Sequence, residues 1–191
     1  MAKPKSEDRR AALLEAAAHV FAENGLGAST ASISAKANVS EGSFFTYFKT
    51  KDDLVNELYR DFRQQLADTI RADFPLRAST RERLEHVWSR YVLWGGQNPI
   101  ARKALKLVSM SHVITETTRA ESARLFAEVE KIQTDAVKQK KGPELPPEMA
   151  SQVLKALAEM TMELIAKQPE RTEEFRAAGF QMLWAALNSK P

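Results

Sequence analysis

Hydroxyl and ammonium side chains gather between residues 29 and 51, and this set is suited to hydrogen bonding with a polyanion. Such side chains, together with main-chain N–H groups at helix starts, are the donors that hold phosphate groups and meet base edges. The candidates are Ser29, Lys36, Ser40, Gly42, Ser43, Thr46, Tyr47 and Lys51. Ser29 and Ser40 are expected to cap two short helices, and capping alone is the alternative to a phosphate contact. Plain solvation is the alternative for Lys51.

Side chains for catalysis or metal binding do not form a pattern. His19, His86 and His112 are scattered without metal-ligand spacing, and there is no cysteine. The sequence contains no glycine loop of the phosphate-cradling type and no nucleophile motif. We therefore expect neither an enzyme nor a metal site, and we expect no cofactor.

The composition is that of a folded globular chain. Hydrophobic residues make up 43% of the 191 residues and charged residues 28%, with a formal net charge of +3. This mildly basic balance permits a polyanion partner without identifying one. The first residues lack an apolar signal segment, and no run is long enough to span a membrane. We expect a cytoplasmic protein with no membrane partner.

Apolar residues recur at helical spacing almost throughout, which predicts an all-α fold of about nine helices and no sheet. A first helix over about 6–24 should end at Gly25, and two short helices over 30–37 and 41–48 should flank a turn at Asn38. Ser79 and Glu82 form a capping box for a fifth helix that Gly95, Gly96 and Pro99 should break. The other helices are expected at about 51–73, 100–108, 125–136, 147–167 and 169–188.

Two short helices joined by a tight turn predict a helix-turn-helix, in which the second helix enters the major groove of DNA. We expect a three-helix head over residues 1–51 and a larger helical body over residues 52–191. Lys3, Lys5, Arg9 and Arg10 form either an arm that follows the DNA backbone or a frayed terminus.

The segment TASISAKANVSEGSFFTYFKTKDDL, residues 30–54, resembles the DNA-binding head of the TetR family of transcriptional regulators. Ile33, Ala37, Val39, Ser40, Gly42, Tyr47, Phe48, Lys51 and Leu54 match the family pattern directly. The resemblance implies a homodimeric repressor that binds a pseudo-palindromic operator on double-stranded DNA, with Lys51 at a phosphate-contacting position. Asn38 replaces the usual Gly, Ser34 an Ala, and Phe45 a Tyr whose hydroxyl would donate to phosphate. Since no Arg or Lys lies between Ser40 and Phe48, base reading falls to Gly42, Ser43, Thr46 and Lys36.

Three blocks, KPKSEDRRAALLEAA, WSRYVLWGGQNP and LKALAEMTME, are similar to RamR-type multidrug-sensing repressors. That resemblance implies a small-molecule inducer, bulky and aromatic or amphipathic, in a pocket lined by Tyr59, Trp88, Tyr91 and Leu154. Phe62 is a neighbour by helical spacing. The alternative is that these aromatic residues belong to the hydrophobic core, as such residues on an apolar stripe usually do.

The last two helices are apolar on two sides, which predicts one face for the protomer core and one for a second copy. The candidate interface residues are Leu157, Ile165, Phe180 and Trp184. Alternatively, both helices are central to the core of a single chain.

A helical protein-interaction module, or a TetR-like regulator without an inducer, is the alternative to a ligand-responsive repressor.

Overall fold

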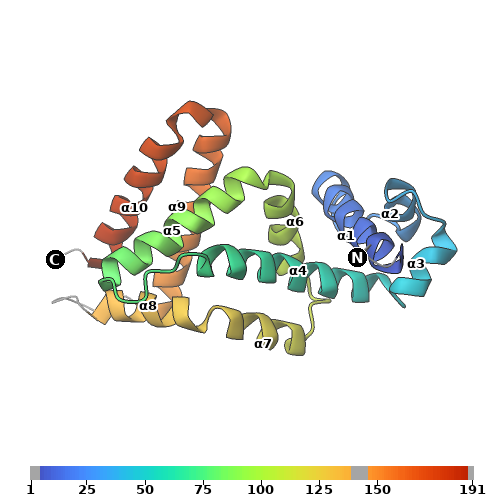
Figure 1. The fold of residues 1–191 in the computed structure, drawn as a ribbon, viewed down its shortest axis with the longest axis horizontal. Coiled ribbons are helices and arrows are strands. Elements are labelled where there is room, and N and C mark those ends of the chain that lie inside the picture. The colour runs from blue at the N-terminus through green and yellow to red at the C-terminus, as the bar shows by residue number, and fades with distance from the viewer. Residues whose placement is uncertain (1–4, 139–145, 189–191) are drawn as a thin grey trace. The chain divides into compact units, whose positions relative to one another are not determined.

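Figure 1 shows the chain as a computed structural model built entirely of helices. The structure describes residues 5–138 and 146–188, and over these ranges it has ten α-helices, one short 3-10 helix and no strand. The prediction of an all-α fold is therefore confirmed, with one helix more than expected. None of these helices is long and apolar enough to cross a membrane.

The α-helices are α1 (Lys5–Asn24), α2 (Thr30–Lys36), α3 (Glu41–Tyr47), α4 (Lys51–Arg71), α5 (Thr80–Gln97), α6 (Pro99–Ser109), α7 (Glu116–Leu125), α8 (Ala127–Lys138), α9 (Pro147–Lys167) and α10 (Thr172–Asn188). The 3-10 helix η1 (Pro169–Arg171) precedes α10. The helices form two compact units, residues 1–64 with 98–123 and residues 65–97 with 124–191, and α4 contributes to both. The predicted boundary between head and body, at residues 51 and 52, is not one of these divisions and stays a prediction about function.

The turns of the N-terminal region have the expected conformations. Gly25 ends α1 with φ of 75°, and Asn38 lies between α2 and α3 with φ of 54°. Both angles fall in the left-handed region, which glycine and asparagine tolerate best. Asparagine can therefore stand where the family pattern has glycine.

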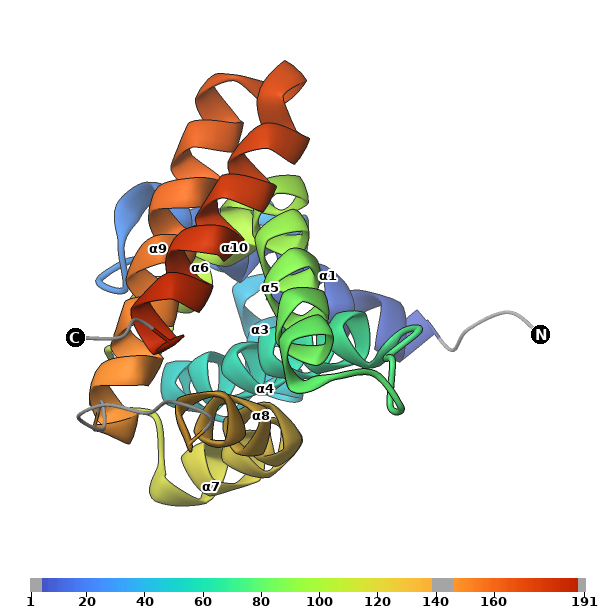
Figure 2. The same cartoon turned by 90° about the vertical axis from the view of Figure 1, so that its left-hand side faces the viewer.

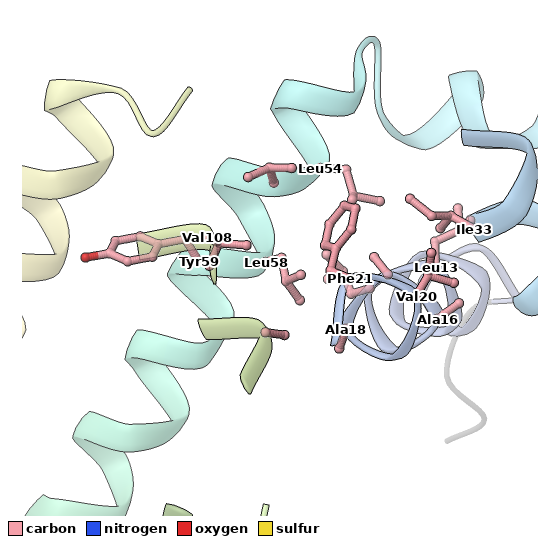
Figure 3. Packing of buried hydrophobic residues seen from close by; sticks show 14 of the residues in the cluster. Leu13, Ala16, Ala18, Val20, Phe21, Ile33, Leu54, Leu58, Tyr59 and Val108 are labelled. Atoms are coloured by element: carbon pink, nitrogen blue, oxygen red, sulfur yellow. The ribbon is translucent and has the colours of Figure 1, made fainter. Parts of the chain in front are cut away.

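The first unit has a core that joins α1 to the first turns of α4. Leu13 and Phe21 of α1 and Leu54 of α4 are fully buried, and Leu58 is 1% exposed. Figure 3 shows Leu54 and Leu58 on the side of α4 that faces Phe21, whereas Tyr59 extends from the other side of α4. The four-residue spacing of Leu54 and Leu58 thus gives α4 one apolar stripe against α1.

α7 is the helix that the sequence did not predict. Its buried side chains are Thr118 and Ser122, so it has no apolar stripe to reveal it. Instead it joins α4 through polar contacts: the Arg60 guanidinium donates to Thr118 Oγ1 at 2.7 Å and to Glu121 at 2.9 Å. Hydrophobic periodicity does not distinguish a helix whose buried face is polar from an exposed loop.

Gly95 and Gly96 do not break α5, contrary to expectation, because the helix continues to Gln97. A side chain on Gly96 would lie 3.5 Å from the Cγ2 atom of Ile165 on α9. That distance is an ordinary van der Waals contact, so α5 packs on α9 here within the second unit without requiring glycine. Pro99 instead begins α6, where its missing N–H has no intrahelical partner to lose.

The capping box at the start of α5 is confirmed. The main-chain N–H of Ser79 donates to the Glu82 carboxylate at 2.9 Å, and the N–H of Glu82 donates to Ser79 Oγ at 3.3 Å. Hydrogen bonding from the Ser79 hydroxyl, and then from its main-chain N–H, lowers the pKa of Glu82.

Asn56 is a buried amide that makes three hydrogen bonds, two of which join α4 to the loop before α7. Its Nδ2 donates to the carbonyls of Asp52 at 2.9 Å and Val113 at 2.8 Å, while Oδ1 accepts from the Thr115 N–H at 3.0 Å. We expect Asn56→Ala to destabilise the protein by about 2–4 kcal/mol, because it leaves a buried donor and a buried acceptor unpaired. Urea unfolding would measure this. Exposed Gln97→Ala is the matched control, and equal free energies of unfolding for the two variants would contradict the prediction.

Candidate nucleic-acid interface

Two serines hold the starts of the short helices α2 and α3. The Ser29 hydroxyl caps α2 by accepting from the Ser32 N–H at 3.1 Å, and the Ser40 hydroxyl caps α3 by accepting from the Ser43 N–H at 3.2 Å. Ser40 Oγ and Ser43 Oγ also lie 2.8 Å apart. Capping is therefore present at both serines, and both stay exposed, so a phosphate contact remains available to each.

The starts of α2 and α3 are also joined to each other. Thr30 Oγ1 donates to the Glu41 carboxylate at 3.2 Å. Beneath this contact, Ile33 and Phe44 are fully buried. One hydrogen bond and one apolar contact region thus fix the angle between the two helices of the predicted helix-turn-helix, which is the angle that DNA recognition depends on.

The predicted contact residues on this pair of helices are all exposed or half-buried. Lys36, Gly42 and Thr46 are exposed, and Ser43 and Tyr47 are half-buried. A Cβ atom on Gly42 would meet no atom within 4 Å, so another molecule can approach the backbone there. The Thr46 hydroxyl lies 3.5 Å from the Gly42 carbonyl. Phe45, whose phosphate role the sequence left in doubt, is 51% exposed on the same helix.

Lys51 is held back onto the turn that follows α1. Its Nζ donates to the Leu26 carbonyl at 2.5 Å and lies 6.0 Å from the centre of the Phe21 ring. One of its three N–H groups is thereby used within the protein, which fixes the start of α4 against α1. The remaining donors leave a phosphate contact possible, and that role stays a prediction.

Arg10 belongs to an ion-pair network in the first unit that the sequence did not predict. Its guanidinium lies 2.7 Å from Glu57 and 5.4 Å from the centre of the Phe48 ring, and Arg60 lies 3.6 Å from the other oxygen of Glu57. A polar cavity of about 290 Å³ adjoins the network, lined by Arg10, Tyr47, Phe48, Asp53, Asn56, Glu57, Arg60, Thr115 and Thr118. Arg10 is thus used within the fold. Of the predicted arm, Lys3 and the side chain of Lys5 lie outside the described residues.

The residues predicted for a ligand pocket fall into both units. In the first, Tyr59 and Phe62 are 8% and 4% exposed. In the second, Trp88 is fully buried and Leu154 nearly so, while Tyr91 is half-buried. The Trp88 indole N–H donates to the Arg176 carbonyl at 2.8 Å. A buried ring with a satisfied N–H is typical of a core tryptophan, and a pocket role for these residues stays a prediction.

The interface residues predicted on α9 and α10 divide into two kinds. Phe180 is fully buried and Ile165 is 7% exposed within the single chain, so Phe180 has no surface for a second copy and that assignment is corrected. Leu157 and Trp184 are partly exposed, and the Arg81 guanidinium lies 5.5 Å from the centre of the Trp184 ring.

Over the part of the chain that the structure describes, no group of three acidic or histidine side chains could hold a metal ion.

Comparison with known proteins finds a family-model match in the N-terminal region and similar folds over nearly the full length. Residues 13–58 match the N-terminal domain of the bacterial regulatory proteins of the tetR family. The fatty acid metabolism regulator protein of Bacillus subtilis is 32% identical over 80 residues, 41% of each chain. The transcriptional repressor KstR2 of Mycolicibacterium smegmatis is 31% identical over 135 residues, 63% of this chain and 62% of that protein. The chain thus covers less than two thirds of the length of these relatives.

Solved structures share the fold over nearly the full length. A TetR family transcription regulator from Marinobacter aquaeolei VT8 has a TM-score of 0.83 at 19% identity, covering 94% of this chain and 95% of that one. FadR from Bacillus subtilis, in complex with stearoyl-CoA, has a TM-score of 0.69 at 20% identity, over 94% and 97%. LfrR from Mycobacterium smegmatis, in complex with proflavine, has a TM-score of 0.68 at 20% identity, over 96% and 99%. At these identities the likeness is one of fold alone.

Proposed function

We propose that the chain is a member of the tetR family of bacterial regulatory proteins and that it represses transcription by binding a pseudo-palindromic DNA operator as a homodimer. The observation that carries the proposal is the match of residues 13–58 to the family's N-terminal domain. The short capped helices α2 and α3 and their exposed hydroxyl surface agree with it. A footprint of the purified protein on DNA upstream of its own gene would test it, since a protected site with two related half-sites is expected.

In this proposal the side chains divide into two roles. Ser29, Ser40, Tyr47 and Lys51 hold phosphates, which sets the position of the protein on DNA without selecting a sequence. Gly42, Ser43 and Thr46 of α3, with Lys36 of α2, lie near base edges in the major groove. DNA shape contributes the remaining selectivity, because no arginine or lysine lies on α3.

We expect Lys51→Ala to weaken binding to all DNA sequences alike and to reduce the salt dependence of binding by about one phosphate contact. Thr46→Ala should instead change base preference while leaving non-specific affinity nearly constant. Fluorescence anisotropy on operator and random duplexes at several salt concentrations would measure both. If Lys51→Ala lowers the melting temperature but leaves the salt dependence unchanged, then Lys51 serves only to bind the Leu26 carbonyl.

A helical protein-interaction module is the second candidate for the head, with α3 binding a partner helix instead of DNA. The two functions differ in their response to salt. Phosphate contacts release counterions, so DNA binding falls steeply as salt rises, whereas apolar helix packing changes little. Absence of binding to any duplex at low salt would favour the interaction module.

The proposed dimer rests on an apolar face that α9 and α10 leave uncovered in the single chain. These helices lie side by side in both views of the fold (Figures 1 and 2). The partly or fully exposed apolar residues on them include Val153, Leu157, Met160 and Leu164 on α9 and Phe175, Ala178, Met182 and Trp184 on α10. Two such helices from each of two chains would form an isologous four-helix interface.

An inducing ligand is the last part of the proposal. We propose a bulky aromatic or amphipathic compound, such as a flat aromatic cation or a bile-acid-like amphiphile. The complexes of LfrR with proflavine and of FadR with stearoyl-CoA offer two different probes. A ligand that prefers the DNA-incompetent state, with a coupling of roughly 1–3 kcal/mol, would weaken operator binding about 5- to 150-fold.

Titration of the protein–operator complex with proflavine, and separately with stearoyl-CoA, would test ligand response. Release of DNA by proflavine alone supports an aromatic inducer, and release by stearoyl-CoA alone favours an acyl-CoA sensor. Tyr91→Ala is the preferred pocket variant, because Tyr91 is half-buried whereas Trp88 lies in the core of the second unit. Operator binding unaffected by either compound would favour a regulator with no inducer of these classes.

A further inference from the structure

Phe45 is an exposed phenyl ring on α3, the helix proposed to enter the major groove. Its exposed fraction is 51%, and it is the only aromatic among the large hydrophobic residues exposed in the described part of the chain. The two phenylalanines nearest to it in sequence, Phe44 and Phe48, are buried. A single exposed apolar residue is ordinary on a protein surface, so the significance of Phe45 comes from its position on α3.

The orientation of this ring is set by the core beneath it. The rings of Phe45 and Phe44 meet edge to face, with centres 5.2 Å apart and planes at 74°. Phe44 is itself fully buried, with its ring centre 5.8 Å from that of Phe48. A braced ring loses little freedom when a partner covers it, which makes Phe45 a preorganised contact.

The other side chains of α3 cannot make the usual contacts with purines. Arginine and lysine read guanine, and asparagine and glutamine read adenine, but the helix EGSFFTY contains none of these. Glu41 accepts a hydrogen bond from Thr30, and the Ser43 hydroxyl bonds with that of Ser40. The direct readout that remains open to an exposed phenyl ring is apolar contact with the 5-methyl group of thymine.

We infer that Phe45 is a specificity-determining residue that reads thymine through its 5-methyl group. Thr46, exposed beside it, offers a second methyl group for the same kind of contact. The inference rests on the proposed function, since it requires α3 to lie in the major groove. A phenyl ring has no hydrogen-bond donor, so Phe45 makes no phosphate contact of the kind that a tyrosine hydroxyl would make.

The test replaces thymine with uracil in an operator duplex obtained by selection with the full-length protein. This change removes only the methyl group and keeps every hydrogen-bonding group of the base. At each contacted position we expect wild-type affinity to fall about fourfold, the value for one buried methyl group. Phe45→Ala should bind the thymine duplex more weakly than wild type and should lose no further affinity on the uracil duplex. Any loss that Phe45→Ala still shows on the uracil duplex measures the effect of uracil on the DNA itself and can be subtracted from the loss of the wild type.

Two variants keep the result interpretable if Phe45→Ala disturbs α3. Phe45→Tyr retains the ring and should retain the dependence on thymine, whereas Thr46→Ser removes only a methyl group and tests the second contact. The salt dependence of Phe45→Ala should equal that of wild type, because no phosphate contact is lost.

Equal binding of wild type to thymine and uracil duplexes would overturn the inference. So would equal losses on uracil for wild type and Phe45→Ala, since another residue would then read the methyl group. Failure to select any duplex has a different meaning: it would reject the proposed DNA-binding function, and the inference with it.

Discussion

The variant Met160→Glu with Met182→Glu is expected to be monomeric and to bind the operator about 10²- to 10⁴-fold more weakly than the wild type. Met160 is 40% exposed and Met182 is 52% exposed in the single chain, so neither change disturbs the protomer core. In the proposed dimer both protomers would bury each introduced glutamate without an opposite charge, at a cost of several kcal/mol in the free energy of association. A monomer then loses the gain that comes from engaging two half-sites at once. Light scattering and operator titration measure the two effects.

Met110→Glu is the matched control for this double variant. Met110 is 81% exposed in the first unit, outside α9 and α10, so a charge there should leave both assembly and operator affinity unchanged. A double variant that stays dimeric would place the interface on another surface. A monomer that keeps full operator affinity would instead contradict the link between dimerisation and DNA binding.

Local signals in the sequence predicted most of the helices and their caps. Ser29, Ser40 and Ser79 each cap the helix they were expected to cap, because a cap depends only on residues two or three positions away. The left-handed turn at Asn38 is equally local. The ends of α2 and α3 and the turn between them could therefore be predicted without any knowledge of tertiary contacts.

Contacts between distant residues were the part that the sequence did not reveal. α7 was missed because its buried residues, Thr118 and Ser122, are polar and pair with α4 instead of forming an apolar stripe. The contact of Arg10 with Glu57 joins residues far apart in the chain, and no spacing rule links them. Charged residues on predicted helices are expected to be solvated by default, so such a network carries no local signal.

Burial also separated residues that share one helix face in the sequence pattern. Phe180 and Trp184 lie four positions apart on α10 and were assigned together to a dimer interface. The structure buries Phe180 completely and leaves Trp184 partly exposed beside Arg81. Periodicity predicts that a helix has two apolar sides, but which neighbour covers each side depends on the packing of the other helices.

Trp88→Ala is expected to destabilise the protein by about 3–5 kcal/mol and to lower its melting temperature by roughly 6–20 °C. Trp88 is fully buried within the second unit, and its indole N–H bonds the Arg176 carbonyl. Removal of the ring therefore leaves a cavity and deletes the side-chain hydrogen bond to the Arg176 carbonyl. Thermal unfolding followed by circular dichroism measures the change. An unchanged melting temperature, with only ligand response lost, would instead assign Trp88 to a pocket.

Gly179 provides an independent test of the same packing from α10. A Cβ atom there would lie 2.5 Å from Trp88 Cζ2 and 2.5 Å from Thr161 Oγ1, closer than real contacts allow. Alanine is favoured over glycine inside a helix by about 1 kcal/mol, yet overpacking costs about 1–3 kcal/mol, so Gly179→Ala should destabilise. The smaller ring in Trp88→Phe vacates part of this space, and Gly179→Ala should cost less in that background. Equal costs in both backgrounds would assign the clash to Thr161 and not to the Trp88 ring, and the pocket assignment would then regain support.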